Sequence, residues 1–190
     1  MRNRVLARSH TNYLAGPLLK SRLIKDLQRL SPVDQVEAVM QSFAERALFR
    51  AFSRGDTRGT RTTFKMQWHR DRDFTLIVDS KAKTLTFPCV LPEVPPRSQM
   101  DREFREWVAQ RQSPGLPEHR RIDATKSALS CLNKKGNLQV TLTLRGRTPD
   151  WEYGARKLVT LVHEVYMSFI HDGRYYTYMI DTFDLDPDHM

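Results

Sequence analysis

The segment from Thr148 to Ile170 constrains the fold of this chain more than any other part of the sequence. Thr148 can accept a hydrogen bond from a free backbone N–H group at the start of a helix, and Pro149 stands where a missing N–H costs nothing. Apolar residues then recur at helical spacing and form a wide stripe: Trp151, Ala155, Leu158, Val159, Leu161, Val162, Val165, Tyr166, Phe169 and Ile170. This width predicts a central helix with a sheet on one side and another element on the other.

The middle of the chain alternates apolar and polar residues with period two, as half-buried strands do. Three such runs, 64–68, 74–78 and 85–89, are joined by the polar links R-D-R-D and D-S-K-A-K and predict an antiparallel meander. The prolines between Pro92 and Pro96 end it, because proline cannot donate to a strand ladder. Residues 122–132 and 138–144 predict a further hairpin, with Gly136 in its turn.

Two further helices are expected around these strands. S-P-V-D at Ser31 is a helix start, and the helical pattern runs over residues 31–54 until Gly55. Ser98, with Asp101 three residues later, starts a helix that extends to about Gln112. From residue 31 the order is therefore α-β-β-β-α-β-β-α, which predicts an α+β fold with an antiparallel sheet and helices packed on it.

The sequence divides into one domain and two extensions. Residues 1–30 predict a basic N-terminal arm and a short helix, residues 17–30. Residues 31–170 predict a single α+β domain. Residues 171–190 contain R-Y-Y-T-Y-M-I, which predicts a strand-like segment that adds an edge strand or lies over the core, and then an acidic tail.

Charge is distributed unevenly along the chain, whose formal charge is +9. Residues 1–72 contain 15 Lys and Arg against 6 Asp and Glu, whereas residues 148–190 contain 3 against 8. A basic balance favours nucleic acid or acidic protein surfaces as partners. The alternative is that the acidic end offsets the basic one, within a monomer or across a dimer.

The sequence also bears on the cellular compartment of the protein and on the state of its two cysteines. No apolar run reaches the ~18 residues of a membrane span, and the basic N-terminus lacks the apolar core of a signal peptide, so we expect a cytoplasmic protein. Cys89 and Cys131 each fall in a predicted strand among apolar neighbours. This placement favours buried free thiols, with a disulfide as the alternative.

Motifs of catalysis and metal binding are not found in the sequence. His163-Glu164 is followed by V-Y-M-S, which does not complete the zinc-protease pattern H-E-x-x-H. The chain has no cysteine pair with zinc spacing, no glycine-rich phosphate loop and no G-x-S-x-G elbow. We therefore expect no cofactor, no metal and no enzyme activity. An enzyme interpretation would require His163 and a carboxylate to meet in a pocket.

One group of residues favours nucleic-acid binding. Arginines recur every four residues along the predicted helix 31–54 and continue into the connection after it: Arg46, Arg50, Arg54, Arg58 and Arg61. On a helix this spacing puts the first three on one face, where they would follow a phosphate backbone. The alternative is a solvated helix face without a ligand.

The element order resembles the type III secretion chaperone-like fold and, within it, the YbjN-like family of bacterial sensory-transduction regulators. The hairpin ending in G-N-L-Q-V-T-L-T-L (residues 136–144) and the helix E-Y-G-A-R-K-L-V-T-L-V-H-E-V-Y (residues 152–166) carry the resemblance, which covers about residues 31–170. It implies a non-enzymatic module, often a homodimer, that holds a partner polypeptide against its sheet or helices. The chain differs from the secretion chaperones in being basic.

Two functional hypotheses follow. The first is a homodimeric protein-interaction or regulatory module with a polypeptide partner. The second is a nucleic-acid-binding protein that uses Arg46, Arg50, Arg54, Arg58 and Arg61. Its affinity for nucleic acid would fall steeply as the salt concentration rises.

Overall fold

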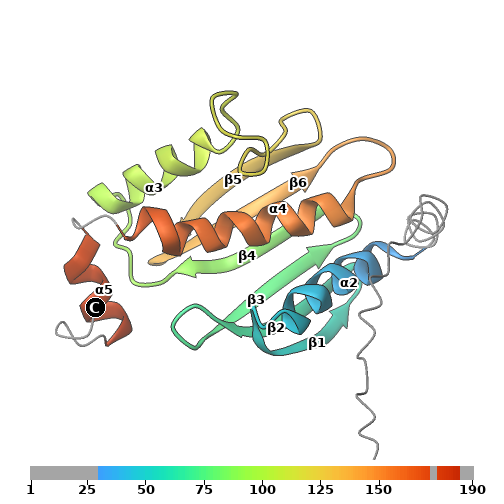
Figure 1. Cartoon of the computed structure of the whole chain (residues 1–190), viewed down its shortest axis with the longest axis horizontal. Helices are drawn as coiled ribbons and strands as arrows, with labels where there is room; N and C mark the ends of the chain where they lie inside the picture. The colour runs from blue at the N-terminus through green and yellow to red at the C-terminus, as the bar shows by residue number, and fades with distance from the viewer. Residues whose placement is uncertain (1–29, 172–174, 185–190) are drawn as a thin grey trace, which may run out of the picture. The chain divides into compact units, whose positions relative to one another are not determined.

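The computed structural model describes residues 30–171 and 175–184 of the chain. An antiparallel sheet of six strands, in the order β1-β2-β3-β4-β6-β5, forms its framework (Figure 1). The strands are β1 (Arg50–Arg58), β2 (Arg61–Trp68), β3 (Arg72–Asp79), β4 (Thr84–Leu91), β5 (Ser127–Lys134) and β6 (Asn137–Leu144). The predicted α+β class is confirmed, and the predicted order of elements is followed with one additional strand, β1.

The helices lie on one face of this sheet, at its β5 edge and near the end of β4 (Figure 1). They are α2 (Pro32–Glu45), α3 (Gln99–Gln110), α4 (Trp151–Glu164) with a π-helical turn η1 (Val165–Phe169), and α5 (Tyr176–Phe183). Helix α4 lies across β4 and β6, while α2 contacts both β1 and α4 (Figure 1). Helix α3 contacts the edge strand β5.

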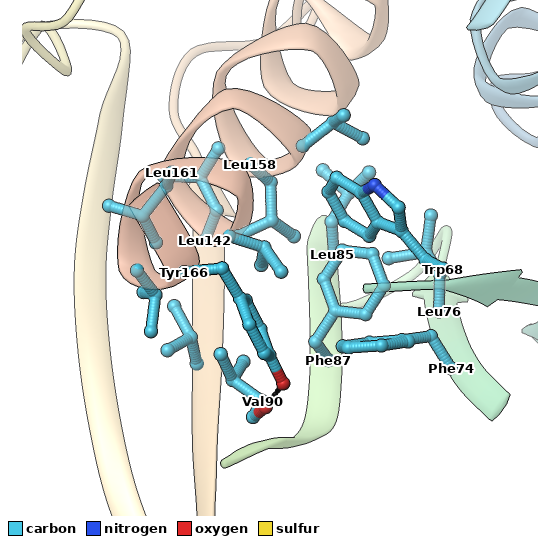
Figure 2. Packing of buried hydrophobic residues seen from close by; sticks show 14 of the residues in the cluster. Trp68, Phe74, Leu76, Leu85, Phe87, Val90, Leu142, Leu158, Leu161 and Tyr166 are labelled. Carbon is cyan, nitrogen blue, oxygen red and sulfur yellow. Dashed lines mark hydrogen bonds between the residues drawn. The ribbon is translucent and has the colours of Figure 1, made fainter. Parts of the chain in front are cut away.

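The core lies between α4 and the sheet, because alternate strand residues point toward the helix. Figure 2 shows Leu158 and Leu161 of α4 above side chains from β2, β3, β4 and β6. Leu158 and Val162 are 1% and 0% exposed, as their place in the predicted stripe requires. Tyr166 in η1 reaches past these side chains, and its hydroxyl donates to the carbonyl oxygen of Val90 at 2.7 Å (Figure 2).

The predicted helix over residues 31–54 is wrong in its second half. Helix α2 ends at Glu45, and the backbone turns at Ala47, whose φ is 58°. The chain then enters β1, where Phe52 stacks on Phe64 of β2 with ring centroids 5.8 Å apart. The apolar positions 48, 49 and 52 satisfy a helical period, but pairing with β2 and this ring contact favour a strand.

The ends of α4 and the C-terminal segment also differ from the prediction. Asp150, and not Thr148, caps α4: its side chain accepts from the backbone N–H of Tyr153 at 2.9 Å. The segment expected to be strand-like forms α5, which packs through its aromatic residues, and the hydroxyl of Tyr178 donates to the carbonyl oxygen of Pro92. The predicted arm, the helix at residues 17–30 and the acidic tail lie outside the described residues, apart from Leu30 and Asp184.

Two further predictions are answered by the structure. Cys89 in β4 and Cys131 in β5 are free thiols, half-buried rather than buried, so the disulfide alternative is wrong. Within residues 30–171 and 175–184, none of the helices combines the length and apolar character that a bilayer crossing demands.

Candidate functional site

The face of the sheet away from α4 carries an uncharged surface, which we call the open face. Its central row crosses five strands through pairs that the register places side by side: Thr63, Ile77, Thr86, Thr141 and Ser130. Neighbouring rows add Thr75, Thr84, Ala128, Leu132, Gln139 and Thr143. These residues are half-buried or exposed, whereas the residues that alternate with them are mostly buried in the core.

The open face arises from the same period of two that builds the core. In β4 and β6 the sequences T-L-T-F and V-T-L-T-L place leucine, valine and phenylalanine toward α4 and threonine away from it. Threonine suits this position because its branched side chain favours a strand and its hydroxyl tolerates water. The local sequence therefore produces a hydroxyl- and methyl-covered surface.

Hydroxyl groups on the open face bond to one another. The Oγ1 atoms of Thr86 and Thr141 lie 3.0 Å apart across β4 and β6. The side-chain amide of Gln139 donates to the same Thr141 oxygen at 3.3 Å. Leu132, half exposed at 50%, adds an apolar side chain at the β5 edge. A surface of this kind can exclude water from a contact without burying an unpaired charge.

Charges of both signs border the open face. Lys65 and Asp73 flank it on β2 and β3, and Arg61 forms an ion pair with Asp79 at 2.8 Å. The backbone N–H of Ala82 and the guanidinium of Arg61 lower the pKa of Asp79 to about 2, so this carboxylate is ionised at neutral pH. The border is thus polar while the centre is neutral, which is typical of a protein-binding surface.

The five arginines singled out in the sequence do not form one helical ridge, because β1 replaces the second half of the predicted helix. Arg46 follows α2, where its Nε donates to the carbonyl oxygen of Ser42 and its guanidinium lies 4.8 Å from the centre of the Phe43 ring. Arg50, Arg54 and Arg58 lie in β1, and Arg61 begins β2. Two irregularities in the β1–β2 pairing also interrupt any regular spacing.

Four of these arginines are close to carboxylates. Arg50 pairs with Asp71 at 2.9 Å. Arg54 pairs with Asp34 at 3.0 Å and with Glu37 at 2.8 Å, which ties β1 to α2. Arg58 lies 3.8 Å from Asp56, and Arg61 is the partner of Asp79. Such pairing reduces the positive field that these residues offer a phosphate backbone.

His163, the residue on which an enzyme interpretation depended, faces aromatic rings. Its ring is stacked with Trp68 and His69 at centroid distances of 6.3 and 5.2 Å, and its Nδ1 is buried without a hydrogen-bond partner. The adjacent Glu164 is engaged elsewhere, by Arg111 at 3.0 Å and Arg120 at 2.9 Å. The carboxylate of Glu164 therefore belongs to a buried ion-pair network with Arg111 and Arg120.

Sequence reasoning did not identify the open face. The alternating threonines in T-L-T-F and V-T-L-T-L were a usable signal, but the row across five strands depends on a register that a single sequence does not give. Comparison with known proteins adds no family: no protein-family model matches the chain, and neither a curated protein nor a solved structure matches it significantly.

Proposed function

We propose that this protein is a non-enzymatic protein-interaction module whose open face binds a second copy of the chain, as a homodimer that serves a polypeptide partner. The observation that carries the proposal is the neutral row Thr63, Ile77, Thr86, Thr141 and Ser130. This row crosses five adjacent strands without a charged side chain, in a chain with 28% charged residues. Depletion of charge at the centre of a patch favours protein contacts.

The size of the open face supports this proposal. Strands about 4.8 Å apart and about 3.3 Å per residue give five strands of eight residues a flat area of roughly 600 Å². A standard interface buries about 800 Å² on each partner. The open face with its charged border approaches this area.

The charge distribution on the open face permits a second copy as the occupant. Two chains of +9 repel each other, so they associate only where positive charge is absent from the contact. The open face meets this condition at its centre, and its border offers both Lys65 and Asp73 for pairing across a two-fold axis.

The test is the molar mass of the full chain by light scattering across a concentration series, with lysine placed at the centre of the open face. We expect a dimer for the unmodified protein and a monomer for Thr141→Lys, because a lysine at the centre of each copy brings two unpaired charges together. Glu45→Lys, on the exposed end of α2, is the control and should remain dimeric. A monomer at every concentration would refute the proposed homodimer.

Nucleic-acid binding by the arginines is the alternative. The ion pairs of Arg50, Arg54 and Arg61 count against it, because a paired arginine offers less positive charge to a phosphate. Fluorescence anisotropy with a labelled duplex separates the two proposals. Affinity that falls steeply with salt and weakens in an Arg50→Ala, Arg58→Ala variant would favour the alternative. An equal affinity of this variant and the unmodified protein would count against it.

A further inference from the structure

A second candidate site lies on the helical side of the domain, between α3 and η1. It is a cavity of about 290 Å³, which we call the acidic–aromatic pocket. Its lining includes Glu103, Glu106, Trp107, Ser168, Phe169 and Tyr175. The pocket thus combines carboxylates and aromatic rings.

Helical spacing builds one wall of the pocket. Residues 103, 106 and 107 are three and four positions apart, so α3 presents them on one face. The opposite wall comes from η1, a π-helical turn, and turns of this kind are frequent at functional sites. This turn directly follows α4, and it places Ser168 and Phe169 in the lining of the pocket.

Ring contacts fix the aromatic wall. The Phe169 ring lies 5.8 Å from Trp107 and 5.0 Å from Tyr175, centroid to centroid. The hydroxyl of Tyr175 donates to Glu103, which also accepts from the side-chain amide of Gln99 at 2.8 Å. Because Glu103 is held in this way, the exposed Glu106 is the carboxylate best placed to meet a ligand.

The chemistry of the pocket matches a guanidinium group. A planar cation pairs with a carboxylate through two parallel hydrogen bonds and stacks on an aromatic ring. Trp107 already makes one such contact, since the guanidinium of Arg111 lies 4.1 Å from its ring centre and occupies one face of the ring. We propose that the acidic–aromatic pocket binds the side chain of an arginine in a partner polypeptide, with Glu106 as the ion-pair partner and the Trp107 and Phe169 rings as the walls.

The size of the pocket and its surroundings fit a peptide side chain. A volume of about 290 Å³ is at the lower end of the range for ligand pockets, which suits one side chain better than a larger molecule. Gln110, one turn after Glu106 and Trp107 on α3, adds an uncharged polar side chain to the lining.

General charge attraction does not account for such binding. The chain as a whole is strongly basic, with a formal charge of +9, and repels a cationic peptide at long range. Binding of an arginine peptide would therefore report a local site. The proposal does not depend on the open face, because the two surfaces share no residue.

The experiment follows the indole N–H signal of Trp107 by NMR while the full chain is titrated with acetyl-Gly-Arg-Gly-amide. Trp107 is half-buried, whereas Trp68 and Trp151 are only 6% and 2% exposed, and a Trp107→Phe variant assigns the signal. The matched probe is the same peptide with citrulline, which replaces the guanidinium by an uncharged urea of similar shape. We expect a saturable shift with the arginine peptide and at least a ten-fold weaker response with citrulline.

Two variants of equal charge change complete the test. Glu106→Gln should weaken the arginine response at least ten-fold, while Glu45→Gln on α2 should leave it unchanged. No shift at Trp107, an equal response to citrulline, or an equal loss in both variants would overturn the proposal. Thr141→Lys should retain arginine binding, so failure of the open-face proposal and failure of this one are read separately.

Discussion

The imidazole rings of His69 and His163 lie 5.2 Å apart, centroid to centroid, within a stack of aromatic rings that joins the β2–β3 hairpin to α4. The His69 ring is also 4.2 Å from that of Tyr166 and nearly parallel to it. The Nε2 atom of His69 and the Nδ1 atom of His163 are both buried without a hydrogen-bond partner. Burial, the nearby His163 and the charge of Arg70 lower the pKa of His69 to about 3. The fold therefore requires a neutral His69.

This arrangement predicts a loss of stability in mild acid. The pKa of His69 is about 3 in the folded protein and about 6.5 in the unfolded chain. Because the folded value is the lower one, stability is complete above pH 6.5 and falls as the pH drops from 6.5 toward 3. Each unit of difference between the folded and unfolded pKa values corresponds to about 1.4 kcal/mol of stability. Because His69 is only half-buried, solvent reduces this effect, and we expect a loss of about 1–2 kcal/mol between pH 6.5 and pH 3. Urea unfolding between pH 7 and pH 4 measures it.

A variant without the titrating group is the control for this prediction. His69→Phe keeps an aromatic ring in the stack and should flatten the stability profile between pH 6.5 and 4. His119→Gln, in the exposed loop between α3 and β5, should leave the profile unchanged. Asp79, whose pKa is lowered to about 2, loses its own stabilising contribution mainly below about pH 4. It does so in the unmodified protein and in His69→Phe alike, so the difference between the two profiles reports His69. Identical profiles for His69→Phe and the unmodified protein would contradict this interpretation.

At Gly154 the backbone of α4 lies close to leucine side chains of the sheet, and Gly154→Ala should destabilise the protein. In an exposed helix this change stabilises by about 1 kcal/mol. Here a Cβ atom would lie 2.7 Å from Cδ2 of Leu144 and 3.0 Å from Cδ1 of Leu85, both in the core. Overpacking of this kind costs about 1–3 kcal/mol, so we expect a net loss of about 1 kcal/mol. A melting temperature above that of the unmodified protein would show that the two leucines can yield.

The parts of the fold that the sequence predicted are those in which one periodicity extends over many residues. The stripe of α4 and the alternation in β2, β3, β4 and β6 are long enough to define both the element and its buried face. The α3 start was also predicted correctly, since Ser98 accepts from the backbone N–H of Asp101. Local chemistry of this kind needs no tertiary information.

The errors occur where tertiary contacts decide between two conformations. Leu48, Phe49 and Phe52 fit a helix, yet the turn at Ala47 and pairing with β2 place Phe52 in a strand. The aromatic residues of the C-terminal segment have high strand propensity, but α5 packs them against the core as a helix. The open face and the acidic–aromatic pocket were not predicted, because strand register and helix packing bring their residues together from distant segments.

The buried ion pair of Arg111 and Glu164 connects α3 to the end of α4, and breaking this pair should be costly. Glu164 is held by Arg111, whose side chain is 7% exposed, and by Arg120, whose side chain is 35% exposed. Glu164→Gln would leave the buried Arg111 guanidinium without a counter-charge, which costs about 3–5 kcal/mol in comparable pairs. Arg120→Ala should cost at most about 1 kcal/mol, since the pair with Arg111 remains. Urea midpoints of the two variants test this order, and equal losses would contradict it.

Leu158 tests the central position of α4 directly. Its side chain is 1% exposed and packs above the sheet (Figure 2), so Leu158→Ala removes buried methyl groups and leaves a cavity. We expect a loss of about 2–5 kcal/mol. Met167→Ala is the control, since that side chain is 53% exposed in η1, and we expect its change to stay within about 0.5 kcal/mol. The measurement is the free energy of unfolding in urea at pH 7, where His69 is neutral in both states. A Leu158→Ala variant as stable as Met167→Ala would mean that α4 does not cover the core, and the assignment of the open face as the exposed side of the sheet would fall with it.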